Sequence, residues 1–92
     1  MIKLFASVNA TDVEALIEAL KSWPDEQREL WGVVERRYYH VVGESRVIVV
    51  NTYNTLEEAQ KHKANVASPE VWDHFEQLGA KPPVTLWIAE EA

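Results

Sequence analysis

The fold of this protein is decided by residues 45–79, which read SRVIVVNTYNTLEEAQKHKANVASPEVWDHFEQLG. Residues 46–53 combine β-branched and aromatic side chains, which is typical of a strand. Thr55 is followed three residues later by Glu58, and this spacing forms a capping box that opens a helix. The stretch therefore predicts a strand that runs directly into a helix.

A second helix start lies in the same stretch. Ser68 can cap a helix, and Pro69 suits the first helical position because its missing N–H would have no partner there. Gly79 predicts the end of this helix. One apolar stripe at helical spacing indicates the face that packs on the core: Val71, Phe75 and Leu78. Trp72 and His74 flank this stripe on opposite sides.

The segments before this stretch supply a strand and a helix. Residues 2–8 alternate between apolar and other side chains, which predicts a strand. Thr11 and Glu14 form a capping box that opens a helix. Pro24 is expected to end or kink this helix, with residues 25–30 adding a further turn or two.

The remaining segments complete a plait. Residues 33–42 and 46–53 are expected to pair as an antiparallel hairpin through the turn at 43–45. Pro82 and Pro83 are expected to close a loop before the last strand, VTLWIA at 84–89. The order β-α-β-β-α-(α)-β predicts a ferredoxin-like α+β plait, with the helices on one face of a four-stranded antiparallel sheet.

Composition narrows the class of protein. The length of 92 residues predicts one domain, residues 1–92, and 47% hydrophobic with 26% charged residues is typical of a globular chain. The net charge of −6 argues against nucleic acid and anionic membranes as partners. The absence of cysteine excludes disulfides and cysteine-ligated zinc. With no signal peptide and no long apolar run, a cytoplasmic location is expected.

Strand alternation divides the sheet residues into two faces. The set expected beneath the helices is Ile2, Leu4, Ala6, Val8, Ile48, Val50, Val84, Leu86 and Ile88. The set expected on the other face is Phe5, Ser7, Val47, Val49, Asn51, Tyr53, Thr85 and Trp87. This second set is too apolar to face water, and a second copy of the sheet is the simplest cover, which predicts a homodimer. The expected dimer-face residues are Phe5, Ser7, Val49, Asn51, Tyr53 and Trp87.

Three residues are candidates for proton transfer. His74 has the unperturbed pKa range of a general base, and Glu70 lies one helical turn before it. Tyr38 and His40 lie in the hairpin strand and would act as a proton relay if they faced a pocket. Each has an alternative reading, as a boundary histidine or as a cross-strand packing pair.

The candidate ligand-pocket residues are Trp31, His62, Trp72 and Phe75. The alternatives are that the aromatic residues fill the core and that His62 lies on a solvated helix face. Asn51 is a polar residue on a strand built for burial, so it needs partners, either across a subunit interface or on a ligand. The three histidines lack metal-ligand spacing, and the chain has no glycine-rich phosphate loop, so neither a metal nor a cofactor is expected.

Residues 45–79 and the final strand VTLWIA resemble the dimeric α+β barrel superfamily, and within it the small proteins grouped with antibiotic biosynthesis monooxygenases. The resemblance implies two sheets packed face to face, with a pocket between helices and sheet in each subunit. Haem-degrading members of the superfamily have an asparagine on the first strand, where this chain has Ala6 and Val8.

The resemblance implies three functions. The first is a cofactor-independent monooxygenase-like enzyme acting on a small aromatic or polyketide-like molecule. The second is a non-catalytic dimeric module that binds a ligand or serves in stress. The third, haem binding or degradation, departs from the family pattern at the first strand. A small hydrophobic or aromatic ligand and a second copy of the chain are therefore the expected partners.

Overall fold

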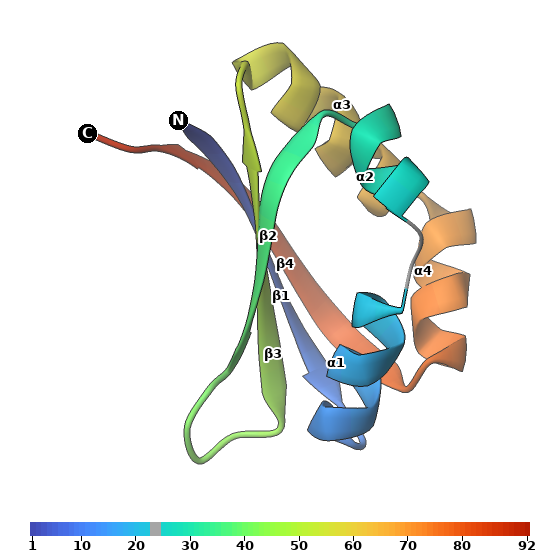
Figure 1. The fold of residues 1–92 in the computed structure, drawn as a ribbon. Helices are drawn as coiled ribbons and strands as arrows, with labels where there is room; N and C mark the ends of the chain where they lie inside the picture. Colours follow the sequence, from blue (N-terminus) through green and yellow to red (C-terminus); the bar gives the residue numbers. More distant parts are fainter. Residues whose placement is uncertain (23–24) are drawn as a thin grey trace.

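The computed structural model describes residues 1–22 and 25–92. Its elements, in chain order, are β1 (Ile2–Ala10), α1 (Val13–Lys21), α2 (Asp25–Leu30), β2 (Val33–His40), β3 (Arg46–Tyr53), α3 (Leu56–Val66), α4 (Pro69–Gln77) and β4 (Ala80–Glu90). The predicted order of strands and helices is confirmed (Figure 1). Pro24, which was expected to end the first helix, lies outside the described residues.

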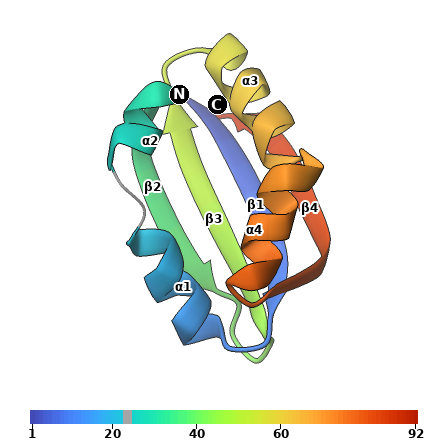
Figure 2. The same ribbon diagram turned by 90° about the vertical axis from the view of Figure 1, so that its right-hand side faces the viewer.

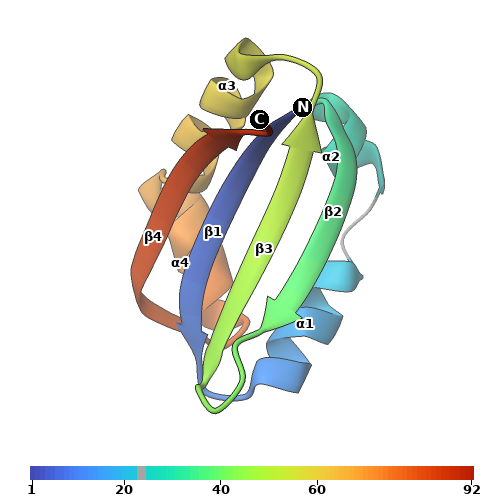
Figure 3. The same ribbon diagram turned by 90° about the vertical axis from the view of Figure 1, so that its left-hand side faces the viewer.

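The four strands form one antiparallel sheet in the order β2-β3-β1-β4. All four helices lie on one face of this sheet, with α1 and α2 toward β2 and with α3 and α4 toward β4 (Figures 1 and 2). The opposite face is bare (Figure 3). The fold is therefore the predicted ferredoxin-like α+β plait.

Two predicted helix starts are confirmed. The hydroxyl of Thr55 accepts a hydrogen bond from the backbone N–H of Glu58 at 3.2 Å and donates one to its carboxylate at 2.9 Å. Ser68 caps α4 by accepting from the N–H of Val71 at 3.4 Å. Gly79 follows α4 with a φ of 101°, a left-handed conformation that glycine adopts without strain. These caps explain why the helices begin and end where the sequence indicates.

The first helix begins one residue later than predicted. Its N-cap is Asp12, whose carboxylate accepts from the N–H of Ala15 at 3.1 Å. Thr11 instead donates its own backbone N–H to the carbonyl of Gly79 at 3.2 Å. Thr11 is thus tied to the end of α4, and the carboxylate next to it takes the capping role.

β3 turns its side chains the opposite way from the prediction. Leu4 pairs with Asn51 and Ala6 pairs with Val49, so these residues share one face of the sheet. That face is the one beneath the helices, because Leu4 packs in one core cluster with Ala59 of α3. The residues wrongly placed on the uncovered face are Val47, Val49, Asn51 and Tyr53. Val49, Asn51 and Tyr53 are therefore not part of that face.

The physical reason is that β3 is apolar on both sides. Ile48 and Val50, expected beneath the helices, lie on the uncovered face opposite Ser7 and Phe5. When both faces of a strand suit burial, alternation shows that successive side chains point to opposite faces. It does not show which set of side chains lies beneath the helices, and we call this choice the phase of the strand. The pairing with β1 settles the phase.

The last strand is longer than predicted. Pro82 and Pro83, expected in a loop, lie within β4, which is an edge strand. Proline is tolerated there because one side of an edge strand has no ladder partner for an N–H. The pairing of β1 with β4 shifts register between Ser7 and Asn9, and Asn9 donates to the carbonyl of Pro82 at 3.4 Å.

The core beneath the helices consists of two clusters of buried residues. One lies between α1 and the sheet and consists of Ala10, Val13, Leu16, Leu20, Val47 and Ala80. The other, next to α3, consists of Leu4, Tyr53 and Ala59. Trp72, Phe75 and Leu78 of α4 pack against the first cluster but are only partly buried. This division leaves incompletely filled space on the helix-covered side of the sheet.

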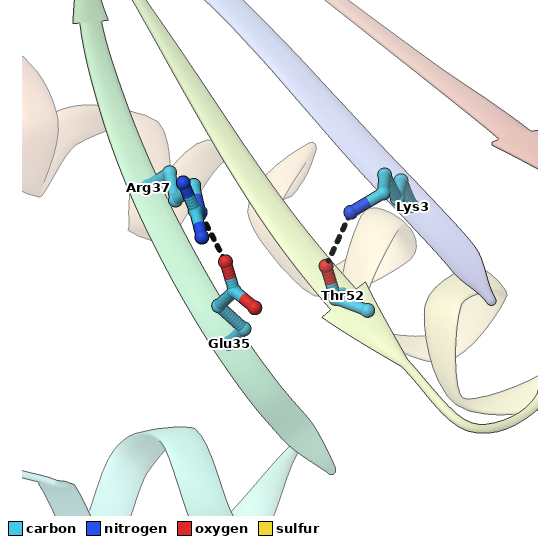
Figure 4. A network of polar contacts seen from close by, with 4 residues as sticks. All are labelled: Lys3, Glu35, Arg37 and Thr52. Carbon is cyan, nitrogen blue, oxygen red and sulfur yellow. Dashed lines mark hydrogen bonds and ion pairs between the residues drawn. The ribbon is translucent and has the colours of Figure 1, made fainter. Parts of the chain in front are cut away.

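The uncovered face is mostly apolar with polar contacts toward β2. Phe5 and Trp87 stack there, with ring centroids 5.1 Å apart and planes 3° from parallel. Lys3 donates to the hydroxyl of Thr52 at 3.0 Å, as Figure 4 shows. Figure 4 also shows Arg37 hydrogen-bonded to Glu35 along β2, and both residues are exposed. A broad hollow of about 570 Å³ lies over this face.

Candidate functional site

A hollow lies between the helices and the sheet. It measures about 70 Å³ and is lined by strand residues such as Leu4, Ala6 and Val49, by α1, and by Trp72 and Phe75 of α4. The lining is mainly apolar. Ala6 extends only a methyl group from the middle of β1, which leaves room between the two core clusters. We call this space the inner hollow.

A second hollow of about 230 Å³ adjoins the first. Its lining comes from Trp31 and from residues of α3 and α4, among them Glu70 and His74, which are exposed. The two hollows share four lining residues: Arg36, His62, Val66 and Phe75. We call this space the outer hollow. Arg36 and His62 therefore lie where the two spaces meet.

Polar side chains meet at this junction. Arg36 of β2 pairs across the strands with Asn51 of β3, and its Nε donates to Asn51 Oδ1 at 2.7 Å. The side chain of Asn51 also lies close enough to the phenol of Tyr53, two residues on, to lower the pKa of Tyr53 through hydrogen bonding. The hydroxyl of Tyr53 is hydrogen-bonded to Nδ1 of His62, which α3 places over the sheet. Four polar residues thus form a continuous chain at the junction.

Burial sets the protonation states of Tyr53 and His62, the last two residues of this chain of hydrogen bonds. The Tyr53 side chain is fully buried and His62 is 5% exposed. Burial raises the pKa of Tyr53 to about 12, against the opposing effects of the Asn51 hydrogen bond and the Arg36 charge. Burial, together with the positive charge of Arg36, lowers the pKa of His62 to about 4. Both groups are therefore neutral at pH 7.

Trp31 covers His62 from the outer side. The two rings stack with centroids 5.2 Å apart and planes 5° from parallel. The ring of Tyr53 meets His62 edge-on at 5.8 Å. His62 is thus held between two aromatic rings, which fixes its plane relative to the hollows.

The proposed ligand-pocket residues are brought together. Trp31 and His62 line the outer hollow, Trp72 lines the inner hollow, and Phe75 lines both. His62 is buried, so the alternative of a solvated helix position is wrong. On α3 it shares the sheet-facing side with Ala59, three residues earlier.

The three proton-transfer candidates are scattered. His74 is exposed at the outer hollow, and Tyr38 lines the inner hollow with its hydroxyl donating to the carbonyl of Leu20 at 3.4 Å. His40 is exposed, and its Nε2 contacts the carbonyl of Glu44 at 2.8 Å. The structure brings His74 and Tyr38 to the hollows, and leaves His40 at the hairpin loop.

Sequence reasoning missed Arg36, and it placed Asn51 and Tyr53 on the wrong face. Arg36 and Tyr38 alternate along β2 and therefore share a face, but the sequence alone does not say whether that face lies beneath the helices. The polarity of Asn51 within an apolar strand did indicate that it needs a partner. The partner that the structure supplies is Arg36 of the same chain, which neither the subunit-interface reading nor the ligand reading named.

Among the side chains that the structure describes, those of residues 1–22 and 28–92, no three from histidine, aspartate or glutamate are arranged to hold a metal ion. No helix in the described part of the chain is both long and apolar enough to cross a membrane.

The fold of this chain is similar to that of solved structures described as antibiotic biosynthesis monooxygenases and as a dimeric ferredoxin-like protein. A monooxygenase from the gene ActVA-Orf6 of Streptomyces coelicolor, in complex with the ligand nanaomycin D, superposes with a TM-score of 0.74 at 14% identity, covering 99% of this chain and 87% of that one. A candidate antibiotic biosynthesis monooxygenase from Nitrosomonas europaea gives 0.68 at 17% identity, covering 99% and 98%.

A dimeric ferredoxin-like protein from an uncultured marine organism also has a TM-score of 0.68, at 14% identity, covering 99% of this chain and 94% of that one. No protein-family model matches the chain, and no curated protein matches its sequence. The likeness therefore establishes the fold.

Stability is expected to fall between pH 6.5 and pH 4 because of His62. In the folded protein His62 gains its proton only near pH 4, whereas in the unfolded chain it does so near pH 6.5. Above pH 6.5, His62 is unprotonated in both the folded and the unfolded state. Between pH 6.5 and pH 4, His62 gains a proton in the unfolded state but not in the folded state. The free energy of unfolding should therefore drop by up to about 3 kcal/mol across this window, as measured by urea unfolding at stepped pH.

Carboxylates also titrate in this range, so the test uses matched variants. His62→Gln should remove this part of the pH slope, while His74→Gln, at an exposed position, should retain the slope of the unmodified protein. Equal slopes for the unmodified protein and His62→Gln would show that His62 does not cause the effect.

Proposed function

We propose that this protein is a cofactor-independent, monooxygenase-like enzyme that acts on a small aromatic molecule held between the helices and the sheet. The proposal treats residues 1–92 as one domain that pairs with a second copy through the uncovered face. The observation that carries it is the pair of adjoining hollows, apolar inside and polar where Arg36 and His62 meet. Pockets for small molecules have this character, with apolar walls and a few placed polar groups.

The proposed reaction is the oxidation of a phenol to a quinone by dioxygen. A ring C–H and the phenolic O–H are lost, one oxygen atom enters the ring, and the other leaves as water. The substrate supplies all four electrons, so no further reductant is needed. The positive charge of Arg36 would favour the phenolate, the electron-rich form that reacts with dioxygen. Water at the outer hollow would receive the phenolic proton, since His62 and Tyr53 cannot accept one at pH 7.

The experiment uses 1-naphthol, a flat phenol whose product would be 1,4-naphthoquinone. Oxygen uptake and quinone absorbance should rise together in a one-to-one ratio. Ala6→Phe, which fills the inner hollow, should lower 1-naphthol binding and oxygen uptake by about ten-fold or more. Leu30→Ala, at an exposed residue of α2, is the control and should leave both unchanged.

A second candidate function is ligand binding without chemistry. This candidate is favoured because neither His62 nor Tyr53 can take up a proton at neutral pH, so neither can act as a general base toward a bound ligand. Binding of 1-naphthol with no oxygen uptake would select this candidate. Absence of binding, in a protein that unfolds cooperatively, would reject the hollow as a site for flat phenols.

A further inference from the structure

We propose that the junction of the two hollows is a donor-only pocket that receives an oxyanion of the ligand, and that the hydrogen-bond chain starting at Arg36 holds His62 as a donor facing this oxyanion. The inference deepens the proposed function and rests on the ligand site described there. It assigns a role to Arg36, Asn51, Tyr53 and His62 together. The ligand class follows as a flat molecule that carries a carboxylate, phenolate or enolate oxygen.

The first step is the direction of the chain. A guanidinium group has only donors, so Asn51 must turn its oxygen toward Arg36, as the 2.7 Å contact with Oδ1 shows. The NH₂ group of Asn51 is then the part of the amide that can donate to the oxygen of Tyr53, and such a donor accounts for the lowering effect of Asn51 on the pKa of Tyr53. Tyr53 has one proton to give, and its hydroxyl contacts Nδ1 of His62. Every bond in the chain therefore runs from Arg36 toward His62.

The second step is the tautomer of His62. Because Nδ1 accepts from Tyr53, the proton of the neutral imidazole lies on Nε2. Nε2 has no hydrogen-bond partner among the described residues, and within that part of the chain no fully buried side-chain nitrogen lacks one. Nε2 is therefore accessible, and His62 lines both hollows. His62 thus offers an N–H to a ligand and has no free lone pair with which to act as a base.

The third step is the charge. Among the side chains that the structure describes, those of residues 1–22 and 28–92, no carboxylate forms an ion pair with Arg36, whose one hydrogen bond there uses Nε. Its terminal NH₂ groups are left for a ligand. The other ionisable side chains that line the hollows are Tyr38 in the inner hollow and Glu70 and His74, both exposed, in the outer hollow. The junction, where Arg36 and His62 lie, therefore carries one positive charge and several donors, while the carboxylate of Glu70 lies on the exposed side of the outer hollow.

The tautomer is tested first, in the ligand-free protein at pH 7. Nitrogen-15 NMR of histidine-labelled protein should show His62 with its proton on Nε2 and an unprotonated Nδ1. Tyr53→Phe, which removes the donor to Nδ1 and keeps the ring, should make the His62 signals change toward a mixture of tautomers. His74→Gln assigns the signals by removing one exposed histidine. A His62 that carries its proton on Nδ1 would overturn the inference.

The ligand class is tested with three probes that share one flat ring system: 2-naphthoate, 2-naphthalenemethanol and 2-naphthylmethylammonium. Calorimetry should find 2-naphthoate bound at least about ten-fold more tightly than the ammonium probe, because charge-assisted hydrogen bonds to a carboxylate are the stronger class. Arg36→Met should lower the affinity for 2-naphthoate by about ten-fold or more and change that for the neutral alcohol by less than about three-fold.

Lys61→Met is the matched control, since it removes one positive charge from the exposed side of α3, the helix that carries His62. It should leave all three affinities unchanged. Equal binding of the three probes would overturn the donor-only pocket while leaving the ligand site intact. Absence of binding by all three would overturn the ligand site, and the pocket with it.

Discussion

On the proposed pairing of two copies through the uncovered face of the sheet, Trp87→Glu is expected to give a monomer where the unmodified protein gives a dimer. The uncovered face of the sheet presents the stacked pair of Phe5 and Trp87 beside Ile48 and Val50, and Trp87 is 39% exposed in the single chain. A contiguous apolar patch of this kind is a site of association. A second sheet would bury Trp87, and a carboxylate buried there without a partner costs several kcal/mol, which raises the dissociation constant by more than about 100-fold.

Size-exclusion chromatography with light scattering measures the outcome. The control is Leu30→Glu, which adds the same charge at a residue of α2 that is 71% exposed and lies on the helix side of the sheet. Leu30→Glu should remain a dimer. An unmodified protein that is monomeric at micromolar concentration would refute the sheet-to-sheet dimer. A Trp87→Glu variant that remains dimeric would show that the dimer interface does not include Trp87.

Leu16→Ala is expected to lower the free energy of unfolding by about 2–5 kcal/mol. Leu16 is 1% exposed in the cluster between α1 and the sheet, and it also lines the inner hollow. Removing three carbon atoms loses their burial and enlarges a space that is already incompletely filled. For a domain of this size, total stability is of the order of 5–15 kcal/mol, so the variant would lose a large part of it.

Urea unfolding followed by tryptophan fluorescence measures this loss. Leu30→Ala is the matched control because it makes the same chemical change at an exposed site, where the expected change is within about 0.5 kcal/mol. Equal losses in the two variants would mean that Leu16 is not part of a packed core. A small loss for Leu16→Ala alone would mean that the neighbouring side chains close the enlarged hollow.

The local features of the fold were predictable because each rests on neighbouring residues. Thr55 and Ser68 cap helices through hydrogen bonds to residues only three positions away. Gly79 ends α4 with a backbone conformation of its own. The shift of the first cap from Thr11 to Asp12 came from a contact outside this range, since Thr11 donates to the distant carbonyl of Gly79.

The candidate site was only half predictable. Trp31, His62, Trp72 and Phe75 could be proposed because aromatic residues and a histidine near a core stripe suggest a pocket wall. Arg36 could not be chosen over Arg37 from the sequence, since both lie in one strand and only the pairing of β2 with β3 decides which faces the helices. The place of Asn51 depends on the same pairing.

By itself the sequence determined the strands, the helices, their order and hence the ferredoxin-like plait, because periodicity, capping and turn residues act within a few positions of the chain. Tertiary structure alone decided which face of β3 lies beneath the helices, because Val47–Tyr53 suits burial on both sides and only the pairing with β1 sets its phase. That choice brings Asn51 and Tyr53 to Arg36 and His62, so the chain of hydrogen bonds at the junction exists only in the folded protein.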